Sequence, residues 1–133
     1  MDSLTQMALG ASVGGAVAGR HIGRKSLLIG AVLGSVPDLD VFIPFNGAVE
    51  TFTYHRSFSH SVIVLTLLTP IFAWLLHRWT FARELTLTRC TLMVWLTLMT
   101  HTLLDAFTVY GTQLFWPLTN YPVSGSSVFI IDP

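Results

Sequence analysis

Charged side chains are scarce in this sequence. They make up 11% of the 133 residues, whereas soluble domains usually carry about 25%. Apolar residues account for 52%, and the mean hydropathy is +0.63. The net charge of zero excludes nucleic acid as a main partner, because phosphate binding needs clustered Lys and Arg. The composition and length predict a single membrane-embedded domain over residues 1–133, with membrane lipids as its surroundings.

Cysteine is almost absent as well. The lone Cys90 lies in an apolar run, so it forms no intrachain disulfide and is expected to be a small buried hydrophobe. The N-terminus carries Asp2 and no basic region before its first apolar stretch. A cleavable signal peptide is therefore not expected.

What the chain does contain is apolar segments. A spanning helix needs about 20 residues, which the last segment reaches, while the first two are short and rich in glycine. The fold class expected is an all-α, multi-pass membrane bundle of about four hydrophobic helices. The segments are Leu4–Gly19, Leu27–Val36, Ser61–Leu76 and Cys90–Tyr110.

Glycines recur four residues apart in the first two segments, as at Gly10 and Gly14 and again at Gly30 and Gly34. This spacing places small residues on one helix face, where backbones approach closely in a membrane. One interpretation is a tight helix pair, either within one chain or between copies in a homo-oligomer. The other is the ordinary tolerance of membrane helices for glycine.

The basic residues indicate a topology. Of the seven Lys and Arg residues, all but Arg56 lie in the connections after the first and third segments. By the positive-inside rule these two connections face the cytoplasm. The 37–60 connection and the stretch from 106 onward then face the opposite side of the membrane.

Three pairs of ionisable residues fall at the predicted non-cytoplasmic ends of the segments. Pro37 ends the second helix, and the two carboxylates after it are expected to point the same way from an extended turn. Ser57 or Ser59 is predicted to cap the third helix, with a histidine in its first turn. The last pair is four residues apart on one helix face. The pairs are Asp38 with Asp40, His55 with His60, and His101 with Asp105.

These six residues are candidate metal ligands. Imidazole nitrogen and carboxylate oxygen suit zinc, manganese, nickel or iron, with zinc as the first choice, and ionisable groups inside membrane segments are usually functional. Taken singly, each pair has a simpler interpretation: a solvated turn, a lipid headgroup contact, or a hydrogen bond between helix neighbours. Convergence of all three at one end favours a shared site. Arg56 is a candidate for neutralising an anionic substrate, or for pairing with a nearby carboxylate.

Several short motifs resemble one bacterial family over essentially the whole chain. It is the inner-membrane metal-dependent hydrolase family of the YdjM type, and the resemblance implies a reaction class without a substrate. Its motif positions fall on the six candidate ligands, with Asp132 as a further candidate. The motifs are Met1–Thr5, Pro37–Asp40, His55–Ser61, His101–Asp105 and Phe129–Pro133.

Two departures from the family pattern matter. Family members commonly carry histidine where this chain has Gln6, and relatives often continue with further membrane helices beyond the position of Pro133. A truncated or degenerate member is therefore one interpretation.

The main functional hypothesis is metal-dependent hydrolysis of an ester or phosphoester in a lipid-like substrate, at the outer face of the membrane. Asp38, Asp105 and Arg56 are the candidate catalytic residues. A bound metal would lower the pKa of a water molecule, and a carboxylate outside the ligand set would act as general base. The rival hypothesis is a non-catalytic membrane scaffold, a metal or proton conduit, or a stress-related protein.

Overall fold

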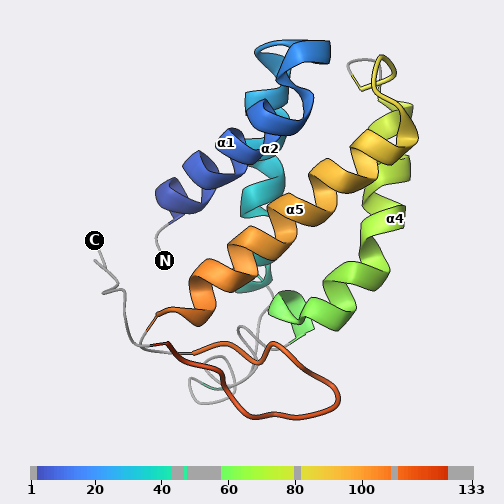
Figure 1. Ribbon diagram of the computed structural model, residues 1–133. Coiled ribbons are helices and arrows are strands. Elements are labelled where there is room, and N and C mark those ends of the chain that lie inside the picture. Colours follow the sequence, from blue (N-terminus) through green and yellow to red (C-terminus); the bar gives the residue numbers. More distant parts are fainter. Residues whose placement is uncertain (1–2, 43–46, 48–57, 80–81, 109–110, 126–133) are drawn as a thin grey trace.

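The computed structural model describes residues 3–42, 47, 58–79, 82–108 and 111–125. Within these ranges the regular elements are all helices (Figure 1), and the nearest approach to a strand is isolated bridges such as the antiparallel one between Thr112 and Val123. The predicted all-α class with about four helices is confirmed. The α-helices are α1 (Ser3–Ile22), α2 (Lys25–Ser35), α4 (Val62–Arg78) and α5 (Leu87–Ala106), and the short 3-10 helices are η1 (Pro37–Phe42) and η2 (Phe58–His60).

Local sequence explains where the helices end. Gly23, with φ of 60°, ends α1 because glycine adopts this left-handed conformation without steric cost. Helix α1 is 20 residues long, so the prediction that the first helix is short was wrong. Pro37 stops α2 as expected, but the chain then forms the 3-10 helix η1. The predicted extended turn at Asp38 and Asp40 was therefore wrong.

The start of α4 also differs from the prediction. Its N-cap is Ser61, whose side chain accepts a hydrogen bond from the Val64 backbone N–H at 3.4 Å. His60 consequently lies in the 3-10 turn η2 just before the helix, and not in the first turn of α4. Ser61 also donates to the Trp116 carbonyl at 2.5 Å, and this contact with a later segment favours Ser61 as the cap.

The sequence predicts membrane-spanning helices, which must be both long enough and apolar enough. Helices α1 and α5 have 20 residues each, yet none of the helices in the described ranges combines the length and apolar character that crossing a membrane requires.

Helices α1 and α2 pack tightly against each other through their glycines. A Cβ added at Gly10 would lie 2.2 Å from the carbonyl oxygen of Gly30, and one added at Gly34 would lie 2.6 Å from the carbonyl oxygen of Gln6. Neither position has room for a larger side chain. The close approach expected from the small-residue spacing thus occurs within one chain.

Helix α5 lies at the centre of the bundle, between the α1–α2 pair and α4 (Figure 1). Its residues Cys90, Met93, Val94 and Leu98 are fully buried and form much of the apolar core. The α1–α2 and α4–α5 connections meet at one end of the molecule, where Arg89 lies 3.3 Å from His21. The opposite end holds η1, η2 and the last turn of α5.

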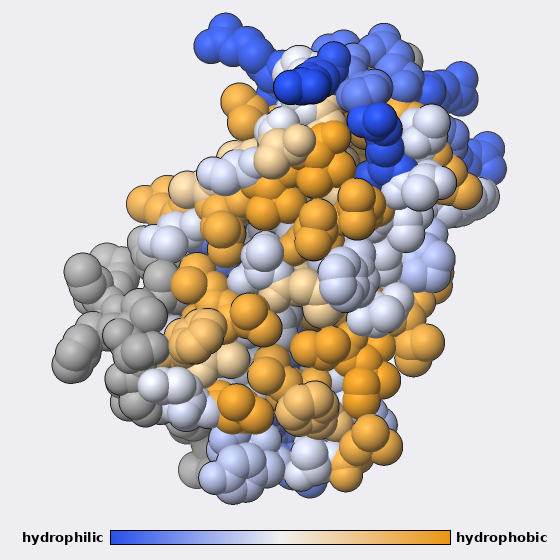
Figure 2. Space-filling view, in the orientation of Figure 1, coloured by the Kyte–Doolittle hydropathy of each residue, from blue (hydrophilic) through white to orange (hydrophobic). Residues whose placement is uncertain are grey.

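The two ends differ in character. Hydrophilic residues gather at the end with the α1–α2 and α4–α5 connections, and apolar residues cover much of the rest of this face (Figure 2). The basic residues at the hydrophilic end are all exposed, and they are Arg20, Arg24, Lys25, Arg78, Arg83 and Arg89. As the sequence predicts, they lie at the end opposite η1 and η2.

Candidate metal centre

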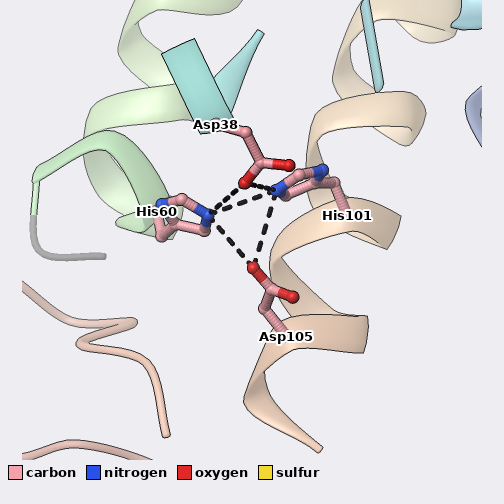
Figure 3. A group of neighbouring side chains, drawn as sticks. All are labelled: Asp38, His60, His101 and Asp105. Carbon is pink, nitrogen blue, oxygen red and sulfur yellow. Dashed lines mark hydrogen bonds and ion pairs between the residues drawn. The ribbon is translucent and has the colours of Figure 1, made fainter. Parts of the chain in front are cut away.

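Four ionisable side chains from separate parts of the chain meet at the η1–η2 end of the bundle (Figure 3). One ligand atom from each lies within 4.8 Å of all the others. The His60 Nε2 atom is 3.2 Å from His101 Nε2, 3.1 Å from Asp105 Oδ2 and 3.6 Å from Asp38 Oδ1. The His101 Nε2 atom is 3.5 Å from Asp38 Oδ1 and 3.7 Å from Asp105 Oδ2.

Each element supplies its residue for a local reason. Asp38 is the second residue of η1 and directly follows Pro37, the proline that stops α2. His60 is the last residue of η2, held in place by the Ser61 cap that follows. His101 and Asp105 are one turn apart on the buried face of α5, as their spacing of four predicts. The site therefore depends on three chain segments closing at one end.

The hydrogen bonds to the histidine rings aim their Nε2 atoms at the cluster. His101 Nδ1 lies 2.7 Å from the carbonyl oxygen of Gly34, and because a carbonyl only accepts, Nδ1 carries the proton. When the ring is neutral, this hydrogen bond leaves Nε2 unprotonated, as in metal-binding histidines whose tautomer a backbone carbonyl fixes. On His60 the corresponding Nδ1 partner is Ser59 Oγ at 3.0 Å.

Burial separates the four residues into two groups. The side chains of His60, His101 and Asp105 are at most 2% exposed, whereas that of Asp38 is 26% exposed. Burying three ionisable groups is costly unless they have compensating partners, which these three find in one another and in Asp38. Because Asp38 is the most exposed of the four, it forms the side of the cluster that solvent or a ligand reaches.

The electrostatics are those of a coupled acid and base. Burial alone would raise the pKa of Asp38, but hydrogen bonds and charge from His101 and His60 outweigh it and hold that pKa well below the usual range. Burial alone would lower the pKa of His60, but Asp105 and Asp38 outweigh it and raise that pKa above its ordinary value. The carboxylates thus favour positive charge at the centre of the cluster.

The donor set fits a divalent metal ion. Tetrahedral coordination with bonds of about 2.0–2.2 Å places neighbouring ligand atoms about 3.3–3.6 Å apart. Five of the six separations, 3.1 to 3.7 Å, bracket that range, and the sixth, between the two carboxylates, is within 4.8 Å. Two imidazoles and two carboxylates suit zinc, and also manganese, iron or nickel.

Gln6 belongs to the same site. It is 1% exposed, and its Nε2 donates to Asp105 Oδ1 at 3.0 Å, the carboxylate oxygen that does not face His60. Gln6 therefore orients Asp105 from behind, in the way that outer-shell residues hold metal ligands. Its own Oε1 is buried and accepts no hydrogen bond among the described residues. The sequence singled out Gln6 only as a departure from the family pattern and missed this supporting contact.

The remaining predicted site residues are not placed. Asp40 lies in η1, but its side chain is outside the described part of the structure. His55, Arg56 and Asp132 also lie outside the described residues, so their roles stay predictions. Of the six predicted ligands, the structure brings together Asp38, His60, His101 and Asp105.

Comparison with known proteins agrees with the resemblance found in the motifs. The family model described as YdjM inner membrane protein matches residues 1–133. The chain belongs to this family. The four clustered residues of this YdjM member lie within the motifs that suggested the family.

A curated relative agrees with this assignment. The inner membrane protein YbcI of Escherichia coli (strain K12) is 29% identical to this YdjM-family chain over 114 residues, which cover 85% of the chain and 64% of that relative. The chain thus spans somewhat less than two thirds of the relative that it matches. Both descriptions name inner membrane proteins, in line with the location expected from the composition. No solved structure matches the chain.

Proposed function

We propose that this YdjM-family protein is a membrane-bound, metal-dependent hydrolase that cleaves an ester or phosphoester in a lipid-like substrate. The observation that supports this most is the meeting of four ligand atoms, from Asp38, His60, His101 and Asp105, at separations that suit one metal ion. Zinc is the proposed metal.

The three buried residues and the partly exposed Asp38 have different proposed roles. His60, His101 and Asp105 are the proposed ligands, a set of two histidines and one carboxylate like that of several catalytic zinc sites. Asp38, which is 26% exposed, orients a water molecule at the open side and accepts its proton. When bound, a divalent cation lowers the pKa of a water molecule and polarises an ester or phosphoryl oxygen.

The wider setting is also a proposal. The chain is proposed to be a multi-pass protein with its metal centre on the non-cytoplasmic side. The support is the exposed basic cluster at the opposite end of the bundle, since basic ends remain in the cytoplasm. Arg56 is proposed from the sequence alone to neutralise charge on the substrate.

The test combines metal analysis with hydrolysis assays on purified protein. The wild type is expected to bind zinc stoichiometrically and to hydrolyse at least one class in a panel of phospholipid and fatty acyl esters. His60→Ala should lose both properties, while His77→Ala, which changes a histidine of α4 far from the cluster, should keep both. Wild-type protein that binds no divalent metal would overturn the proposal.

The rival is a structural metal site in a non-catalytic scaffold. One observation favours it: four protein ligands with tetrahedral spacing fill a zinc site completely, as structural sites do. Asp38→Asn separates the two functions. A general base predicts retained zinc with hydrolysis reduced roughly 100-fold or more, whereas a closed structural site predicts weaker zinc binding and a wild type without hydrolysis.

A further inference from the structure

An apolar groove runs along the face between α2 and α4. It has a volume of about 430 Å³ and is lined by Leu28, Ile29, Val32 and Leu33 of α2 and by Phe72, Leu75, Leu76 and Trp79 of α4, with Lys25 at one end. Helix α2 packs on α1 and α5, and α4 packs on α5. The facing sides of α2 and α4 therefore remain open to an occupant.

A second, smaller groove continues the first toward the metal centre. Its volume is about 240 Å³, and Phe72 lines both grooves. Its walls include Pro37 of η1 and Ser59 of η2. These two residues directly precede Asp38 and His60, so the apolar path ends beside the most exposed residue of the cluster.

The dimensions of the path suit an acyl chain. At about 1.5 Å per residue, the α2 stretch from Lys25 to Val36 is about 17 Å long. The hydrocarbon core of a bilayer is roughly 30 Å thick, so one leaflet accommodates acyl chains over about 15 Å. Exposed leucine and valine side chains, with Leu28 70% and Val32 59% exposed, would contact such a chain along its length.

We propose that this path, the α2–α4 groove and its continuation, binds one acyl chain of a membrane phospholipid. The proposal rests on the proposed function and narrows its substrate to phospholipids. The methyl end of the acyl chain lies near Lys25 and Trp79. The ester or phosphoester lies at Asp38, and the three buried proposed ligands lie behind it. The methylene stem of Lys25 lines this end of the groove.

The experiment uses phospholipids with a photoreactive diazirine in one acyl chain, present as a tracer in vesicles that hold the purified protein. A diazirine close to the ester should label residues of the second groove, such as Leu39, Val64 and Leu68. A diazirine near the chain end should label Leu28 and Leu75. Labelled peptides are identified by mass spectrometry.

Two leucines of α4 provide a matched pair of variants. Leu75 lines the groove and is 48% exposed, whereas Leu67 is 70% exposed and lines neither groove. Leu75→Trp should fill the groove, reduce labelling of α2 at least fivefold and reduce phospholipid hydrolysis similarly, with zinc binding unchanged. Leu67→Trp should change none of these.

The outcomes distinguish this proposal from the proposed function. Groove labelling that Leu75→Trp abolishes, in protein without hydrolysis or zinc binding, supports the lipid site while the hydrolase proposal fails. Hydrolysis and zinc binding with labelling spread evenly over the Leu67 and Leu75 faces overturns the lipid site alone. Crosslinks from groove residues to a second protein chain would also overturn it, because a helix would then be the occupant.

Discussion

Gln6 shows how one side chain changes the interpretation of this site. The family resemblance implies a histidine at this position, so the sequence suggests a lost ligand. In the structure its amide donates to the Asp105 oxygen that faces away from His60. A histidine nitrogen at this place would meet the same oxygen, so glutamine can take over a supporting hydrogen bond. The substitution is therefore compatible with an intact cluster of Asp38, His60, His101 and Asp105.

Gln6 substitutions test this interpretation. Gln6→Leu removes the hydrogen bond to Asp105 at similar volume and should weaken zinc binding roughly 10–100-fold, the usual effect of losing an outer-shell partner. Gln6→His should bind zinc within a few-fold of the wild type, because a ring nitrogen restores the donor. Calorimetric titration with zinc measures both. Unchanged affinity in Gln6→Leu would contradict a supporting role.

The protonation of His60 predicts how stability depends on pH without metal. A raised pKa of His60 contributes stability that is fully present below its ordinary value of 6.5 and is lost as the pH rises through the folded-state pKa. The lowered pKa of Asp38 contributes stability that is present above 3.8 and is lost as the pH falls. Metal-free protein should therefore melt at a lower temperature at pH 8.5 than at pH 6.

The stabilisation by zinc should show the opposite dependence on pH. Metal binding needs unprotonated imidazole, so the increase in melting temperature caused by zinc should grow from pH 6 to pH 8.5. Thermal melts over this range, with zinc and with a chelator, measure both effects. The same melts on His60→Gln provide the control, which should lose most of the pH dependence. An increment that shrinks as the pH rises would contradict the assignment of His60 as a ligand.

At the scale of the elements, helix α2 both packs against α1 and contacts a residue of the candidate metal centre. Its glycines allow close contact with α1, and Gly34 lies in its last turn, where carbonyl groups have no partner within the helix. The Gly34 carbonyl instead accepts a hydrogen bond from His101 Nδ1–H. The glycine spacing that builds the α1–α2 pair thus also positions the acceptor that fixes the tautomer of a proposed ligand.

Alanine substitutions separate this position from an ordinary helix glycine. In Gly34→Ala the new Cβ would lie 2.6 Å from the Gln6 carbonyl oxygen, whereas in Gly19→Ala its nearest neighbour, Ser26 Oγ, would be at 3.6 Å. Gly34→Ala should destabilise the fold by about 1–3 kcal/mol through overpacking and weaken zinc binding. Gly19→Ala should be neutral or stabilising by up to about 1 kcal/mol. Chemical unfolding and zinc titration compare the two, and equal effects would contradict the packing argument.

At the scale of the whole molecule, the bundle is polarised. Exposed basic residues surround the α1–α2 and α4–α5 connections, while the metal cluster lies at the other end, beside the 111–125 segment (Figures 1 and 3). That segment is attached there by the hydrogen bond from Val62 N–H to the Leu114 carbonyl at 3.0 Å. In the proposed topology, an anionic inner leaflet would attract the basic end and leave the cluster at the opposite face.

The orientation can be measured with single cysteines. In a Cys90→Ala background, Asn120→Cys places a thiol at the cluster end and Arg83→Cys places one at the basic end; both positions are exposed. In intact bacterial spheroplasts, a membrane-impermeant maleimide should label Asn120→Cys and leave Arg83→Cys unlabelled until the cells are opened. The reverse pattern would place the metal centre in the cytoplasm and contradict the proposed topology.

The sequence by itself determined the helical class and the polarity of the bundle, and it named the four residues that the structure brings together as a candidate metal site. It could do so because apolar runs, the placement of basic residues and a histidine four residues before an aspartate are local patterns that can be read from short stretches of sequence. The 3-10 turns at Asp38 and His60, the Ser61 cap and the role of Gln6 were decided by the tertiary structure alone. They depend on contacts between segments 50 to 100 residues apart in the chain, such as Ser61 with Trp116 and Gln6 with Asp105, and local patterns carry no information about which distant group completes a hydrogen bond.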